Sequence, residues 1–315
     1  MDKYYLEHTF NAYCDGKIDF NDFLNIELKT NIEEIKVEKR EVVKCSEKLK
    51  RIHSFFNQFI FDNLEIQEDC VFSYRKNVNV LDCIAPHSKN KFIFKTDIHS
   101  FFHSISKKTI YNCIFTQIDN QPLSDIESYL DRICNLVTYK DRLPQGFSTS
   151  PVLSNAVFNN FDIKIKKHCN RNNMIYSRYA DDLLISSNNY LDKEECIHDI
   201  DNILNSCFEQ KFKINTLKTK LIKKGKNMEV MGVQIHPDGS LSIGKRLKNE
   251  IETKLYLFLK NQNDFVSYSS LDKNHAIARL SGQLNYINTI DPKYIDKLKY
   301  KYGNSLVDLF FRKAI

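Results

Sequence analysis

The chain has 315 residues, a hydrophobic fraction of 42% and a formal net charge of +6 at pH 7. This length can build one large domain or two to three packed subdomains. No apolar run is long enough to cross a bilayer, and the N-terminus mixes charged residues with aromatics, unlike a secretory signal. We therefore expect a cytoplasmic protein without membrane contact, whose nine cysteines, none in a Cys-x-x-Cys pair, are reduced thiols.

The first half of the chain predicts helices followed by a strand. Residues 1–70 are expected to be mainly helical, because apolar residues recur at three- and four-residue spacing. The residues on this predicted face are Leu49, Ile52, Phe56, Phe59 and Ile60. Residues 91–97 alternate apolar and polar side chains and predict a strand that ends at Asp97. A helix is expected to start at Ser150, with Pro151 at its first helical position.

The second half predicts two hairpins and then helices. Residues 175–187 hold two β-prone runs around residues 180–182, and residues 230–243 hold two more around residues 237–239. From Leu247 onward the period is helical again. The residues expected to share a face there are Ile251, Leu255, Phe258 and Leu259. Strands and helices mix without regular alternation, which predicts an α+β fold.

Positive charge is concentrated between Lys211 and Lys260, where twelve Lys or Arg residues stand against four acids. The rest of the chain is then slightly acidic. A basic region of this kind indicates a polyanionic partner. A solvated helix face is the alternative interpretation of the same charge pattern.

Two adjacent carboxylates, Asp181 and Asp182, are expected at the turn of the first hairpin. Adjacent carboxylates repel each other and are costly to desolvate, unless divalent cations neutralise them. Asp97 supplies a third carboxylate at the end of its own strand. Three carboxylates from neighbouring strand ends can hold two magnesium ions about 3.5–4 Å apart. A solvated loop is the usual setting of an isolated Asp-Asp pair, so the flanking segments decide the interpretation.

Short motifs follow one another along the chain. Residues 96–102 read TDIHSFF, residues 143–146 read LPQG and residues 179–182 read YADD. Further motif residues are Arg40 with Val42, Leu49 with Lys50, Thr149 to Pro151 with Asn155, Asn215 with Lys218 and Thr219, Met231 with Gly232, Leu280 to Gly282, Tyr286 with Ile287, and Asp291 with Pro292. In this order they resemble bacterial reverse transcriptases of the retron and group II intron type, over nearly the whole chain.

The resemblance implies roles in nucleotidyl transfer. Asp97 and Asp181 would be ligands of two Mg²⁺ ions, assisted by the backbone carbonyl of Ile98. Asp182 would orient the site or bind metal more weakly. Lys218 matches a lysine placed to protonate or neutralise the leaving pyrophosphate.

The resemblance also implies a deoxynucleoside triphosphate pocket. Phe102 matches a steric gate that excludes a 2′-hydroxyl, while Phe101 is expected in the core because adjacent strand residues face opposite sides. Gln145 and Gly146 would line the pocket, the glycine letting backbone approach the ligand. Arg40 resembles the fingers cation that holds the triphosphate.

A right-hand polymerase with fingers, palm and helical thumb is the fold that the resemblance implies. The expected bounds are 1–90 and 103–142 for the fingers, 91–102 and 143–244 for the palm, and 245–315 for the thumb. Lys245, Arg246 and Lys248 would contact the backbone of an RNA template or RNA/DNA hybrid. A structured non-coding RNA and an effector protein are further expected partners, in a retron or related anti-phage defence system.

Two alternatives remain beside RNA-templated DNA synthesis. One is untemplated or protein-primed DNA synthesis, as in some defence-associated relatives. The other is a non-catalytic scaffold that binds RNA and an effector.

Overall fold

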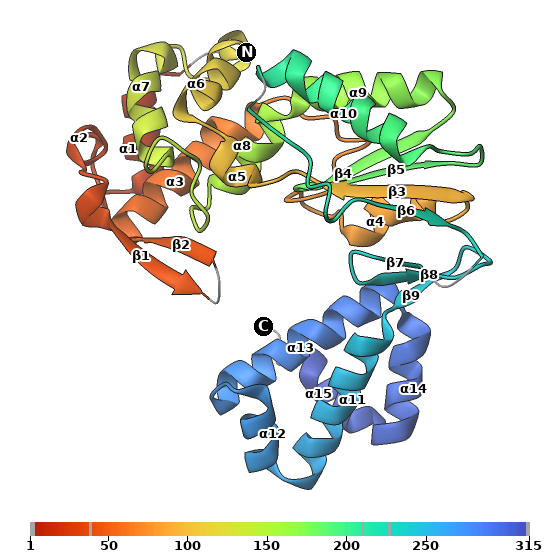
Figure 1. Ribbon diagram of the computed structural model, residues 1–315. Coiled ribbons are helices and arrows are strands. Elements are labelled where there is room, and N and C mark those ends of the chain that lie inside the picture. Colours follow the sequence, from red (N-terminus) through yellow and green to blue (C-terminus); the bar gives the residue numbers. More distant parts are fainter. Residues whose placement is uncertain (1–3, 38–39, 210, 226–227, 313–315) are drawn as a thin grey trace. The chain divides into compact units, whose positions relative to one another are not determined.

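The computed structural model describes residues 4–37, 40–209, 211–225 and 228–312, and the side chains of Arg40 and Arg312 lie outside this described set (Figure 1). The chain divides into two compact units. Unit 1 comprises Met1–Cys83 and Ile93–Leu221, and unit 2 comprises Ile84–Phe92 and Ile222–Ile315.

Unit 1 begins with helices and a two-stranded ribbon that projects from them (Figure 1). Its first elements are α1 (Leu6–Cys14), α2 (Phe20–Asn25), η1 (Lys29–Asn31), β1 (Ile32–Val37), β2 (Arg40–Cys45), α3 (Glu47–Phe59) and η2 (Phe61–Asn63). The predicted helix face is confirmed in α3, where Leu49, Ile52 and Phe56 are fully buried. The expectation of a mainly helical segment missed the β1–β2 ribbon. Its apolar residues Ile32 and Ile35 stand three apart, a spacing that fits a helix as well, and most of β1 is solvent-exposed.

The central sheet has the strand order β4-β5-β3-β6. Its strands are β3 (Phe92–Asp97), β4 (Ile175–Tyr179), β5 (Asp182–Ser187) and β6 (Lys220–Lys223). The predicted strand ending at Asp97 and the predicted hairpin are both confirmed. Helices α9 (Asn159–Arg171) and α10 (Lys193–Phe208) cover one face of the sheet (Figure 1). Residues Ile93 and Phe94 are both buried, so β3 contributes to the core from both of its faces.

Further helices lie between the strands of the ribbon and of this sheet in the chain. They are α4 (Val80–Ile84), η3 (Ala85–His87), α5 (Phe101–Ser104), α6 (Lys107–Phe115), η4 (Ile118–Asn120), α7 (Ile126–Val137) and α8 (Ser150–Val157), and of these η3 belongs to unit 2. The expected helix at Ser150 is confirmed, with Pro151 in its first turn, although Thr149 rather than Ser150 is the cap residue. The Ser150 hydroxyl instead donates to the carbonyl of Pro144 at 2.6 Å.

Unit 2 combines a three-stranded meander with a helical bundle. The meander is β7 (Met228–Val230), β8 (Val233–Ile235) and β9 (Leu241–Ile243), so the predicted second hairpin is confirmed and gains a third strand. The bundle is α11 (Lys245–Lys260), α12 (Gln262–Ser269), α13 (Lys273–Ile290), α14 (Pro292–Tyr302) and α15 (Asn304–Arg312). In α11, Ile251 and Leu255 are buried as expected, but Leu259 is 56% exposed, contrary to the predicted face.

Helices and antiparallel strands thus coexist, and the predicted α+β class is confirmed. Within the described part of the chain, every helix is too short or too polar to span a membrane.

Candidate active site

The central sheet brings Asp97 and Asp181 together. Asp97 is the last residue of β3, and β3 lies beside β5 in the sheet. Asp181 lies in the two-residue turn between β4 and β5, where Tyr179 pairs with Asp182. The backbone N–H of Ile98 donates to the carbonyl of Asp181 at 2.9 Å, which joins the two carboxylate segments directly. Their proximity therefore follows from strand order and not from flexible side chains.

Asp97, Asp181 and Asp182 lie close to one another and to two lysines. Lys218 Nζ donates to Asp97 Oδ2 at 2.6 Å, and Lys95 Nζ pairs with Asp182 Oδ1 at 3.0 Å. Burial, with the neighbouring negative charges of Asp182 and Asp97, raises the pKa of Asp181. The hydrogen bond to Asp97 raises the pKa of the Lys218 ammonium. The site therefore concentrates negative charge, which is balanced in part by two lysines.

A divalent cation fits this donor set. Asp97 is 6% exposed, and its Oδ1 is buried with no hydrogen-bond partner among the described residues. An unpaired buried carboxylate oxygen is costly, and a cation is the partner that removes the cost. Carboxylate and carbonyl oxygens are also the ligands that Mg²⁺ prefers. Over the described ranges, however, no three His, Cys, Asp or Glu side chains converge on one point. One oxygen each of Asp97 and Asp182 is paired with a lysine instead.

A cavity of about 380 Å³, here called the aspartate cavity, opens beside these carboxylates. Six of the residues expected from the sequence line it: Asp97, Ile98, Phe102, Gln145, Asp181 and Lys218. Tyr74, His103 and Asn215 line it too. Asn215 belongs to a quoted motif, whereas no sequence pattern pointed to Tyr74. All these residues belong to unit 1.

The two adjacent phenylalanines have different environments. Phe101 is 3% exposed and its ring lies 4.9 Å from that of Phe158, so it belongs to the core. Phe102 is half-buried and lines the aspartate cavity, with the Tyr74 ring at 6.4 Å. Phe101 is therefore in the core as expected, but the division is incomplete, because Phe101 also borders the aspartate cavity. The reason given, that adjacent strand residues face opposite sides, was wrong, because the two residues lie at the start of helix α5 and not in a strand.

Gly146 packs against β2 and does not line the cavity. Its φ is +106°, and a Cβ there would lie 2.5 Å from the Val43 carbonyl oxygen and 2.7 Å from Val42 Cγ1. The Val43 N–H donates to the carbonyl of Gln145 at 2.8 Å. The glycine thus permits the close approach of β2, and this approach holds Gln145 at the cavity.

The four basic residues expected to bind phosphates belong to β2 and to unit 2. Arg40 is the first residue of β2, paired with Val37, and its side chain falls outside the described residues. Lys245 and Arg246 are exposed in the first turn of α11, in unit 2. Lys248 instead turns inward: its Nζ pairs with Asp291 at 3.0 Å and lies over the Tyr294 ring at 4.6 Å from the ring centre.

The comparison with protein families decides the class. The family model for reverse transcriptase (RNA-dependent DNA polymerase) matches residues 32–235, which include both aspartate segments and the aspartate cavity. The chain belongs to the reverse transcriptase family. The enzyme class expected from the sequence, an RNA-directed DNA polymerase with the right-hand fold of this family, is therefore confirmed.

Several relatives are similar over most of the chain. The Retron Ec83 reverse transcriptase of Escherichia coli is 29% identical over 76% of this chain and 75% of its own length. The Retron Ec86 reverse transcriptase of the same organism is 26% identical over 84% of this chain and 78% of its own length. Among solved structures, a telomerase from Candida albicans is similar with a TM-score of 0.48 and 13% identity. That match covers 90% of this chain but 60% of the telomerase chain.

Proposed function

We propose that this reverse transcriptase copies RNA into DNA by two-metal nucleotidyl transfer in the aspartate cavity. The observation that carries the proposal is the meeting of Asp97 and Asp181 in one cavity with Lys218, Phe102 and Gln145. The orphaned Oδ1 of Asp97 supports a cation at that point. The reaction joins a primer 3′-hydroxyl to the α-phosphate of a deoxynucleoside triphosphate and releases pyrophosphate.

Each residue has a proposed part in this reaction. Asp97, Asp181 and the carbonyl of Ile98 would hold two Mg²⁺ ions, and Asp182 would orient the turn. When bound, the metal would lower the pKa of the attacking hydroxyl and balance charge on the leaving pyrophosphate. The Lys218 side chain is 68% exposed, so it can leave Asp97 and either protonate the pyrophosphate or neutralise its charge.

The nucleotide is proposed to lie between Phe102 and Gln145. The half-buried Phe102 ring would stand against the sugar and exclude a 2′-hydroxyl. Gln145 is held at the cavity by its bond from β2, so that it can contact base or sugar. Gly146 would contribute indirectly, because it permits the close approach of β2 that holds Gln145. Arg40, at the start of β2, would reach the triphosphate.

The subdomains are proposed to follow the bounds expected from the sequence, with fingers at 1–90 and 103–142, palm at 91–102 and 143–244, and thumb at 245–315. Lys245 and Arg246 would contact phosphates of the RNA template or RNA/DNA hybrid. Lys248, with its partner Asp291, would position the first turn of α11. The similarity to retron enzymes supports a structured non-coding RNA and an effector protein as partners, in a retron or related defence system.

The test measures labelled deoxynucleotide incorporation by the purified protein with Mg²⁺. A primed RNA template and a no-template control are compared for wild type, Asp181→Asn/Asp182→Asn, and Asp119→Asn, an exposed aspartate outside the cavity. Template-dependent extension is expected for wild type and Asp119→Asn, and not for the double variant.

Two results would redirect the proposal. Equal incorporation with and without template would favour untemplated or protein-primed synthesis. RNA binding without incorporation, with the host's copurified RNA also supplied, would favour a scaffold.

A further inference from the structure

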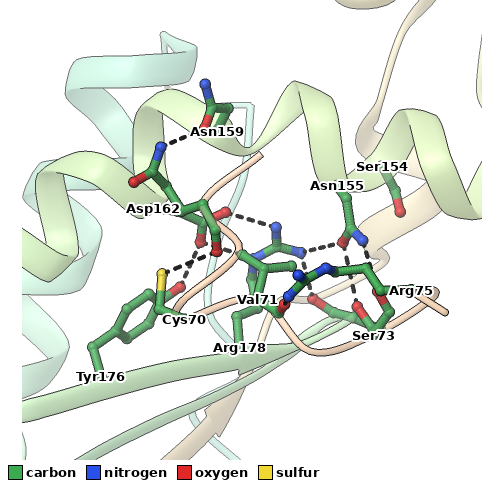
Figure 2. A network of polar contacts seen from close by, with 12 residues as sticks. Cys70, Val71, Ser73, Arg75, Ser154, Asn155, Asn159, Asp162, Tyr176 and Arg178 are labelled. Atoms are coloured by element: carbon green, nitrogen blue, oxygen red, sulfur yellow. Dashed lines mark hydrogen bonds and ion pairs between the residues drawn. The ribbon is translucent and has the colours of Figure 1, made fainter. Parts of the chain in front are cut away.

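Arg178 is fully buried, one residue before the YADD turn begins. It pairs with Asp162 of α9 through two bonds, Nε to Oδ1 at 2.9 Å and Nη2 to Oδ2 at 2.7 Å (Figure 2). The hydroxyl of Tyr176 donates to the same Oδ1 at 2.7 Å. A buried ion pair contributes little net stability by itself, because desolvation opposes the attraction. The remaining contacts of the guanidinium therefore carry more information about its role.

The third nitrogen of Arg178 contacts the catalytic turn. Nη1 donates to the carbonyl of Ala180 at 3.2 Å. Ala180 has φ +56°, in the left-handed region that non-glycine residues rarely adopt. Strained backbone persists where its surroundings hold it in place. The guanidinium thus restrains the peptide that directly precedes Asp181.

The same nitrogen is also linked, through Asn155, to the residue that precedes Tyr74 of the cavity lining. Nη1 donates to Asn155 Oδ1 at 3.1 Å, and Asn155 Nδ2 donates to the carbonyl of Ser73 at 2.8 Å (Figure 2). The backbone of Arg178 pairs with this segment as well, through Cys70 at 2.7 Å and Phe72 at 3.0 Å.

Tyr74 follows this restrained segment directly. It has φ +58° and lines the aspartate cavity beside Phe102. The segment that Arg178 holds therefore ends at the cavity wall, next to the proposed gate.

We propose that Arg178 is a positioning residue that sets both sides of the aspartate cavity. Through Ala180 it places the turn of Asp181, and through Asn155 it places the Ser73–Tyr74 wall beside the gate. The inference deepens the proposed function and rests on it. A planar guanidinium can serve Asp162, Asn155 and Ala180 in one plane, whereas a lysine ammonium has three donors radiating from one point.

The experiment compares Arg178→Lys with Tyr176→Phe, each in the full-length chain. Tyr176→Phe is the matched control, because it deletes one buried hydrogen bond to Asp162 and keeps the Arg178 bonds to Ala180 and Asn155. The first readout is Mn²⁺ binding, measured by electron paramagnetic resonance on purified protein without nucleotide. The second is kcat and KM for deoxynucleotide incorporation at varied Mg²⁺ concentration.

Arg178→Lys is expected to weaken Mn²⁺ binding about tenfold and to lower kcat by about tenfold to hundredfold, since small displacements of catalytic groups carry losses of this size. Tyr176→Phe should keep wild-type Mn²⁺ affinity. Asn155→Ala separates the two sides: it should raise the KM for deoxynucleotides severalfold and leave Mn²⁺ affinity unchanged.

Wild-type Mn²⁺ affinity in a folded Arg178→Lys, or an equal shift in Tyr176→Phe, would overturn the inference. If Arg178→Lys does not fold, an unchanged KM in Asn155→Ala overturns it instead. If the wild type incorporates no deoxynucleotide while Arg178→Lys still weakens Mn²⁺ binding, the proposed function is refuted, and only the part of the inference that concerns the cation site is retained. If the wild type incorporates deoxynucleotides and the variants match it in Mn²⁺ affinity, kcat and KM, the inference is refuted and the proposed function stands.

Discussion

Replacing Gly146 with alanine should loosen the packing between the LPQG segment and β2. The φ of +106° is unfavourable for any L side chain, and strain of this kind costs about 1–3 kcal/mol. The new Cβ would also lie 2.5 Å from the Val43 carbonyl oxygen, which is backbone and cannot rotate away. β2 must then shift and lengthen the Val43–Gln145 hydrogen bond, a loss of about 1 kcal/mol. Together these lower the free energy of unfolding by about 2–4 kcal/mol.

Chemical denaturation measures this change, with Gly16→Ala as its control. Gly16 has φ +70° but nothing within 4 Å of a Cβ, so alanine there adds backbone strain alone. Gly146→Ala should be clearly less stable than Gly16→Ala. It should also raise the KM for deoxynucleotides, because Gln145 moves with the segment. Equal stability of the two variants would refute the reasoning, since the close approach to β2 would then carry no cost.

Two further predictions concern the gate and the core. Phe102→Val should raise ribonucleotide incorporation relative to deoxynucleotide incorporation by on the order of tenfold or more, as a ratio of kcat/KM values. Phe10→Leu, a change at a fully buried residue of α1 that does not line the cavity, should lower stability and leave that ratio unchanged. Burial lowers the pKa of His53 to about 4, whereas an unfolded histidine titrates near 6.5, so its contribution to stability is present above about pH 6.5 and is lost as the pH falls toward about 4. The Tm of His53→Gln should therefore fall less than the Tm of the wild type between about pH 7 and about pH 5. An equal fall in both proteins would contradict the lowered pKa of His53.

Local patterns in the sequence were sufficient to predict the strand and the turn that carry Asp97 and Asp181. A strand that ends in Asp97, and β-prone runs on both sides of Asp181, depend on residues within a few positions of each other. Strand and turn preferences act over that range. The order of the motifs then indicated the family, and with it that these two carboxylates belong to one site. The helix face of α3 followed from periodicity, and the helix start at Ser150 followed from Pro151, although the cap itself is Thr149.

Only the tertiary structure decided which partners each side chain has. Arg178 meets Asp162 sixteen residues away, and Lys218 meets Asp97 across 121 residues. Gly146 is needed for the backbone of β2, and Lys248 turns to Asp291, although the sequence suggested ligand contacts for both. No periodicity encodes such pairs, because packing of distant segments selects them and leaves no regular spacing in the chain. The sequence by itself therefore determined the family and the strands that carry Asp97 and Asp181, whereas the packing determined the partners that hold these residues.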